Sequence, residues 1–160
     1  MKKILRQFIL TMFCLMLVCT AISVSAEVPV TVTILHTNDI HGRVETGNGM
    51  GLPKMAALIK RIKTENPQTL LLDAGDAIHG TNFANLMKGE SMIKLMNAMG
   101  YTAMAPGNHD FNYGYQRLVA LADQVANFPI LCANIKKDGE FLFKPYIIKE
   151  VGGKKLPSSA

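Results

Sequence analysis

The run TLLLDAGD, at residues 69–76, decides the fold of this chain. Residues 69–73 form an apolar run, which is typical of a strand covered on both faces of a parallel sheet. Gly75 then breaks the run, and Asp76 follows it in a polar loop. Open α/β sheets carry their functional groups in the loops that follow their strands. We therefore expect a buried strand with a functional residue at its end.

The alternation of strand and helix continues on both sides of this run. Residues 52–65 carry apolar side chains at three- and four-residue spacing with basic residues between them, which indicates an amphipathic helix. The sequence predicts helices at residues 52–65, 91–99 and 113–127, strands at residues 28–35, 69–73, 101–105, 128–134 and 146–151, and a turn at residues 136–139. Such alternation is typical of parallel βαβ units, so the expected fold class is α/β.

Composition excludes several classes of protein. The 160 residues are enough for one domain or part of one, and 49% hydrophobic with 18% charged residues excludes a disordered chain. Residues 27–160 hold 14 basic and 12 acidic side chains, a net charge of +2. A charge this small gives no electrostatic basis for binding a nucleic acid polymer.

The first 26 residues have the pattern of a secretory signal peptide. Three basic residues lie among residues 1–6, residues 7–26 carry no charge, and Val-Ser-Ala at residues 24–26 precedes Glu27. We expect cleavage before Glu27, no stable membrane insertion afterwards, and a secreted, periplasmic or cell-envelope location. The alternative is an uncleaved transmembrane anchor. Polar residues within the apolar stretch favour cleavage.

Acidic, amide and imidazole side chains follow three of the predicted strands. Asp39 and His41 are two residues apart, so their side chains would lie on one side if the strand continued. A carboxylate and an imidazole at that spacing can bind one divalent cation. Gly75 would let the backbone and a metal approach closely at Asp76. Together these positions predict part of a metal site.

The third polar loop contains Pro106 and Gly107, followed by Asn108 and His109. A Pro-Gly turn is rigid and can hold the next side chains at the rim of the sheet. Because three such loops follow successive strands, the pattern predicts a site with two metal ions. All four histidines lie in loops after predicted strands; we interpret His36 and His79 as supporting or structural residues.

Residues 36–42 (HTNDIHG), 73–76 (DAGD) and 106–111 (PGNHDF) resemble the first three signatures of the calcineurin-like metallophosphoesterases. The opening LHTND, at residues 35–39, is similar to the branch of secreted 5′-nucleotidases and 2′,3′-cyclic-nucleotide phosphodiesterases. The resemblance covers roughly residues 28–151. It implies the N-terminal portion of a two-sheet sandwich flanked by helices and built from βαβ units.

The resemblance also implies roles for individual residues. The implied metal ligands are Asp39 and His41 for the first ion, Asp76 bridging both ions, and Asn108 for the second. The implied catalytic residues are His109, Asp110 and Asn112, with His109 stabilising charge on the phosphate or protonating the leaving oxygen. Mixed oxygen and nitrogen ligands suit two divalent ions of Mn, Zn, Fe or Co.

Asn112 departs from the pattern of many 5′-nucleotidases, which have an aspartate at this position. An amide can orient His109 but supports an imidazolium less well than a carboxylate does. The asparagine resembles the cyclic-phosphodiesterase side of the family.

The expected function is therefore metal-dependent hydrolysis of phosphoesters in a small-molecule nucleotide substrate. One alternative is a non-catalytic metal- or nucleotide-binding envelope protein derived from the same family. Another is a structural α/β domain. The sequence carries no signal for an oligomeric state.

The sequence contains no histidine after His109. The family takes its remaining metal ligands from later histidines, usually one alone and then a Gly-His-x-His motif. We therefore expect residues 27–160 to be an incomplete N-terminal part of a metallophosphoesterase domain and, by themselves, a poor catalyst.

Overall fold

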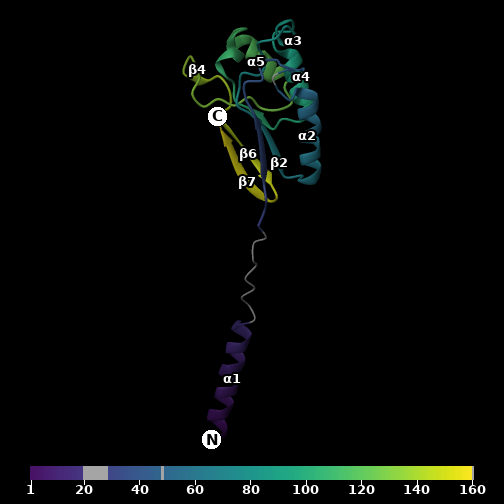
Figure 1. Ribbon diagram of the computed structural model, residues 1–160. Helices are drawn as coiled ribbons and strands as arrows, with labels where there is room; N and C mark the ends of the chain where they lie inside the picture. Colours follow the sequence, from purple (N-terminus) through teal and green to yellow (C-terminus); the bar gives the residue numbers. More distant parts are fainter. Residues whose placement is uncertain (20–28, 48, 160) are drawn as a thin grey trace.

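The computed structural model describes residues 1–19, 29–47 and 49–159. Helix α1 (Lys2–Cys19) stands apart from the folded body in Figure 1, and residues 2–13 are all exposed. Within the described residues, no helix has both the length and the apolar character needed to cross a membrane. The predicted cleavage position before Glu27 lies outside the described residues.

A three-stranded parallel sheet forms the centre of the fold. Its strands are β1 (Thr33–Thr37), β2 (Thr69–Asp73) and β3 (Ala103–Met104), with β2 in the middle. Every residue of β1 pairs with β2, from Thr33 opposite Thr69 to Thr37 opposite Asp73. The two strands therefore end at the same level, and the loops that follow them start side by side. The predicted βαβ arrangement is confirmed.

The helices connect these strands and cover the core. They are α2 (Leu52–Glu65), α3 (Asn82–Asn85), α4 (Glu90–Met99), η1 (Asn108–Phe111) and α5 (Tyr115–Gln124). The predicted bounds of α2 and β2 are correct, and α4 begins one residue early. Helices α3 and η1 were not predicted from the sequence, because single turns are too short to show an amphipathic period.

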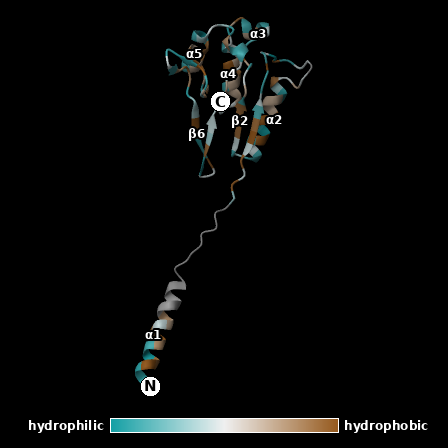
Figure 2. Cartoon of the chain, turned by 90° about the vertical axis from the view of Figure 1, so that its left-hand side faces the viewer, coloured by the Kyte–Doolittle hydropathy of each residue, from teal (hydrophilic) through white to brown (hydrophobic). Residues whose placement is uncertain are grey.

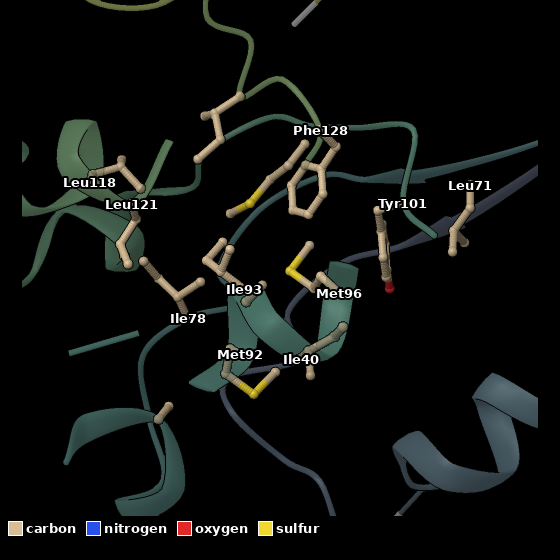
Figure 3. Packing of buried hydrophobic residues seen from close by; sticks show 14 of the residues in the cluster. Ile40, Leu71, Ile78, Met92, Ile93, Met96, Tyr101, Leu118, Leu121 and Phe128 are labelled. Carbon is tan, nitrogen blue, oxygen red and sulfur yellow. The ribbon is translucent and has the colours of Figure 1, made fainter. Parts of the chain in front are cut away.

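The core lies between the sheet and helices α2, α4 and α5. Met92, Ile93 and Met96 of α4 are fully or almost fully buried, and Figure 3 shows their side chains between those of α5 and the sheet. Tyr101 and Phe128 extend the cluster, with their ring centroids 6.1 Å apart. The methionines of α4 are thus packing residues. In Figure 2, hydrophilic colour gathers in the loops near α3 and α5, at the end far from α1.

Three predicted strands differ from the structure. The first is shifted along the chain to Thr33–Thr37, so His36 lies in β1 and not in a loop. The third is reduced to Ala103–Met104. Residues 128–134 form no regular strand, only isolated bridges from Ile130 to Met104 and from Leu131 to Lys144. Proline at position 129 has no N–H to donate, so it can contribute only its carbonyl, which accepts the Met104 N–H at 3.1 Å.

Two antiparallel hairpins complete the described chain. The first joins β4 (Lys136–Lys137) and β5 (Glu140–Phe141), which confirms the predicted turn between them. The second joins β6 (Tyr146–Val151) to β7 (Lys154–Ser159). Strand β6 has its predicted bounds, whereas β7 was not predicted from the sequence. Strand β7 is polar and contains a proline, a composition that edge strands tolerate but that does not identify a strand.

One buried carboxylate connects the loop after β2 to the loop after β3 by hydrogen bonds. The Asp110 side chain is fully buried. It accepts hydrogen bonds from four backbone N–H groups: Asp76 (2.8 Å), Ala77 (3.0 Å), Ile78 (3.0 Å) and Gly107 (2.8 Å). Burial raises the pKa of Asp110, and the N–H donors act against that shift. Both carboxylate oxygens are needed, because each accepts two of the bonds.

A second buried acid, Asp73, lies at the end of β2. Thr37 donates a hydrogen bond of 2.6 Å to one carboxylate oxygen, and the Gly75 N–H donates one of 2.9 Å to the other. Because the Thr37 proton points at Asp73, the Tyr101 hydroxyl donates to Thr37, at 2.7 Å. Burial raises the pKa of Asp73 to about 6 and that of Tyr101 to about 12.

The raised pKa of Asp73 makes the stability of the chain depend on pH. The folded protein holds this proton up to about pH 6, whereas the unfolded chain releases it near pH 3.8. The contribution of Asp73 to stability is therefore largest in acid and is lost as the pH rises to about 6. We expect it to be about 1 kcal/mol greater at pH 5 than at pH 7. Urea unfolding of the wild type and Asp73→Asn at both pH values measures this difference. Equal changes in the two proteins would contradict the assignment.

Substitution of Asp110 tests whether its hydrogen bonds hold the two loops together. Asp110→Asn places an amide NH₂ group against two backbone N–H donors, so two buried hydrogen bonds are lost. We expect the free energy of unfolding to fall by about 3 kcal/mol. Asp138→Asn is the matched control, because Asp138 is an exposed turn residue at φ 52°, which asparagine also tolerates. Equal stabilities of Asp110→Asn and Asp138→Asn would show that the Asp110 carboxylate is not needed to connect the two loops.

Candidate functional site

The loop after β1 lies along the loop after β2. The N–H groups of Asp39, His41 and Gly42 donate to the carbonyls of residues 75, 76 and 77, at 2.9, 2.8 and 3.0 Å. Asp39 and His41 have left-handed backbones, with φ of 54° and 49°. The expectation that both would leave one side of a continuing strand is wrong, because β1 ends at Thr37. The two left-handed turns bring the side chains together instead, with His41 Nε2 3.6 Å from Asp39 Oδ1.

Asp76 completes this cluster from the neighbouring loop. Ligand atoms of Asp39, His41 and Asp76 all lie within 4.8 Å of one another, and no other group of three acids, histidines or cysteines does so in the part of the chain that the structure describes. Asn38 Nδ2 donates to Asp39 Oδ2 at 2.6 Å and so holds that carboxylate. The Asp39 side chain is 61% exposed and that of His41 25%, so both are accessible from solvent. The structure brings together three of the four predicted metal ligands.

Two glycines let the loop after β3 approach this cluster. Gly75 has φ 102°, and a Cβ there would collide with the backbone of Gly107. A Cβ on Gly107 would in turn collide with the Asp76 carboxylate. Gly75 thus admits the second loop, while the approach of a metal at Asp76 stays a prediction.

This approach brings the backbone on either side of the fourth predicted ligand, Asn108, against Asp76. The backbone N–H of His109 donates a hydrogen bond of 2.8 Å to Asp76 Oδ1, and Gly107 contacts the same carboxylate. Asn108 lies between these two residues in the chain, at the start of η1. The two carboxylates and the imidazole of the cluster are oxygen and nitrogen donors that suit a divalent metal ion.

The predicted catalytic residues lie on η1 and directly after it, next to the cluster. The His109 ring is 5.2 Å from the His41 ring, measured between centroids, at an interplanar angle of 72°. Asn112 follows one turn later and its Nδ2 donates to His109 Nδ1 at 3.0 Å. Residues three apart on a 3₁₀ turn lie above one another, which explains the contact. With Nδ1 occupied, His109 has Nε2 free to meet another group.

Asp110 differs from the other two predicted catalytic residues. It is buried and bonded to backbone N–H groups of both loops, as described above. This geometry gives it a positioning role, while a direct catalytic role stays a prediction.

The remaining histidines divide between the site and the sheet. His36 lies on β1, where it lines a cavity of about 220 Å³ with Leu72 and Ser158, away from the metal cluster. His79 lies next to His109, with centroids 5.8 Å apart and rings nearly parallel at 9°. Its position three residues after Asp76 was the only signal in the sequence for this contact.

A cleft of about 920 Å³ opens beside Asp39. It is lined by residues 38–40, 42–47, 49–52 and 55, together with Thr81, Asn82 and Phe83. Arg43 and Phe83 offer a positive charge and an aromatic ring at its wall. Its volume is that of a site for a small molecule.

The sequence and the fold match those of known proteins. Residues 32–156 match the family described as calcineurin-like phosphoesterase. The chain is 40% identical to snake venom 5′-nucleotidase of Gloydius brevicauda, over 86% of this chain and 26% of that protein. It is 39% identical to 5′-nucleotidase of Bos taurus, over 78% of this chain and 25% of that protein.

A solved structure agrees with these relatives. The crystal structure of a 5′-nucleotidase precursor from Thermus thermophilus superposes with a TM-score of 0.70 and 32% identity, over 79% of this chain and 27% of that one. The chain thus spans about a quarter of the length of these relatives. The expected fold class is confirmed, and the chain belongs to the calcineurin-like phosphoesterase family.

Proposed function

We propose that this protein is a metal-dependent hydrolase of nucleotide phosphoesters, with nucleoside 5′-monophosphates and 2′,3′-cyclic nucleotides as substrates. The observation that carries the proposal is the convergence of Asp39, His41 and Asp76 beside His109. The names of the most similar relatives reported above, which are 5′-nucleotidases, support the nucleotide as the substrate class.

Four residues of this chain would supply part of the ligand set of two divalent ions. Asp39 and His41 would hold the first, Asp76 both, and Asn108 the second. Such ions, when bound, supply Lewis-acid activation of water and of the phosphate.

The protein side chains provide orientation and proton transfer. Because Asn112 donates to Nδ1, the neutral His109 ring carries its proton on Nε2 and can donate it in a hydrogen bond to a phosphate or leaving-group oxygen. Asp76 accepts a hydrogen bond from the backbone N–H of His109. This bond fixes the position of His109 relative to the metal cluster. The cleft beside Asp39, with Arg43 and Phe83 at its wall, would hold the rest of the substrate.

Asn112 bears on the range of these substrates. Its amide orients His109 but does not offset the charge of an imidazolium as a carboxylate would. We propose that the activity is therefore not restricted to 5′-monophosphates and includes 2′,3′-cyclic nucleotides.

Substitution of the bridging acid tests the proposed function. Asp76→Asn keeps an acceptor for the His109 N–H but removes the negative charge, so the loops stay connected while metal affinity falls. We expect Mn²⁺-dependent hydrolysis by the intact protein to fall about 100-fold, measured as phosphate or monoester release from both substrate classes. Asp123→Asn, an exposed acid on α5, is the control and should retain wild-type rates. Metal binding by the wild type without turnover would contradict the hydrolase and favour a non-catalytic binding protein.

We also propose that residues 1–26 direct export and are removed. Their basic start and uncharged stretch support this, as does the exposure of residues 2–13 in α1. The protein recovered outside the cytoplasm should begin at Glu27, as mass spectrometry would show. An intact Met1 in the exported protein would support the uncleaved anchor instead.

A further inference from the structure

Three imidazole rings lie in a row at the site, and the outermost belongs to His79. The His109 ring lies 5.2 Å from that of His41 and 5.8 Å from that of His79, centroid to centroid. The side chain of Tyr113 also packs against His79, at 5.3 Å between ring centroids. His79 belongs to neither the metal cluster nor the catalytic set described above.

A single amide group connects His79 to His109. Asn112 Nδ2 lies 3.0 Å from His109 Nδ1 and 3.2 Å from His79 Nδ1. An amide nitrogen carries two hydrogens and accepts none, so it donates one to each ring. Each neutral ring must then accept at Nδ1 and carry its own proton on Nε2.

The second bond matters because it fixes which way the Asn112 amide faces. The Asn112 side chain lies at the surface, where its amide nitrogen contacts the two imidazoles. With one bond alone, the amide could turn and present its oxygen to His109 Nδ1. That arrangement would move the His109 proton to Nδ1 and leave Nε2 without a hydrogen to donate.

His79 is itself held by its surroundings. The Tyr113 hydroxyl donates to Asn85 Oδ1 at 2.6 Å, and the Gly80 N–H donates to the same oxygen at 3.1 Å. The ring against His79 and the backbone next to it are thus anchored to one side chain of α3. A Cβ on Gly80 would collide with the backbone of His41, so this loop also lies tightly against the metal cluster.

We propose that His79 is a positioning residue for phosphoester hydrolysis. It accepts the second hydrogen of Asn112 Nδ2, locks the orientation of that amide, and so keeps the proton of His109 on Nε2, where it can be donated to the substrate. The role in hydrolysis rests on the proposed function, whereas the control of the His109 tautomer does not.

Substitutions at position 79 separate this role from a structural one. Glutamine can accept the Asn112 hydrogen through its side-chain oxygen, whereas leucine fills similar space without an acceptor. We expect His79→Leu to lower kcat about tenfold with little change in KM, and His79→Gln to stay within about threefold of the wild type. His36→Leu is the control for replacing a histidine, because His36 lies on β1 away from the site. Equal losses in the leucine and glutamine variants, or no loss in either, would overturn the proposal.

A second substitution tests the path through Asn112. In an Asn112→Ala background the amide that connects His79 to His109 is absent, so His79→Leu should cause no further loss of kcat. Independent, multiplicative losses would mean that His79 acts in another way.

Nitrogen-15 NMR of the imidazoles provides a readout that does not require activity. The wild-type chain should show His109 in the Nε2–H form, and His79→Leu should add a population with the proton on Nδ1. An unchanged His109 spectrum in His79→Leu would overturn the positioning role even if hydrolysis were slow. If the tautomer shifts as expected but the wild type hydrolyses no phosphoester, the proposed function alone is contradicted.

Discussion

The arrangement of the site depends on the four hydrogen bonds that backbone N–H groups donate to the Asp110 carboxylate. Three of the donors are consecutive residues of the loop after β2, and the fourth is Gly107 in the loop after β3. A buried carboxylate is costly unless such donors compensate for its lost hydration. The acid can therefore be buried only where both loops meet. Asp76 and His109 flank this point, so their relative position follows from it. The loop after β1 joins the same assembly by main-chain bonds, because its N–H groups donate to carbonyls of residues 75–77. All three loops are thus connected largely through backbone groups, which leaves the side chains of Asp39 and His41 available for the proposed metal site.

The sequence predicted the composition of this site better than its geometry. Helix α2 and strand β2 could be predicted to the residue because their periodicity extends over several turns or a whole buried strand. Asp39, His41 and Asp76 were identified from their place after the strands, yet the left-handed turns that bring them together leave no periodic signal. The glycine at position 75 was recognised as permissive, but its partner, Gly107, comes from a loop 32 residues later.

The contacts of His79 could not be predicted from the sequence for a similar reason. Its importance lies in contacts with residues 109, 112 and 113, and only the parallel packing of β2 and β3 brings those residues near it. Strand β7 could not be predicted because it is defined by its hydrogen bonds to β6 and not by its own composition. Contacts between distant segments decide such features, and local propensity does not report them.

The left-handed backbones of Asp39, His41 and Asp76 place this chain between two opposing kinds of selection. Each carries a side chain at φ between 49° and 58°, where a residue other than glycine costs about 1 kcal/mol. A lineage selected only for a durable fold would exchange these residues for glycine or asparagine, and would become more stable as its ligands disappeared. Two acids and a histidine at such positions are therefore explained better by the site they form than by the stability of the fold.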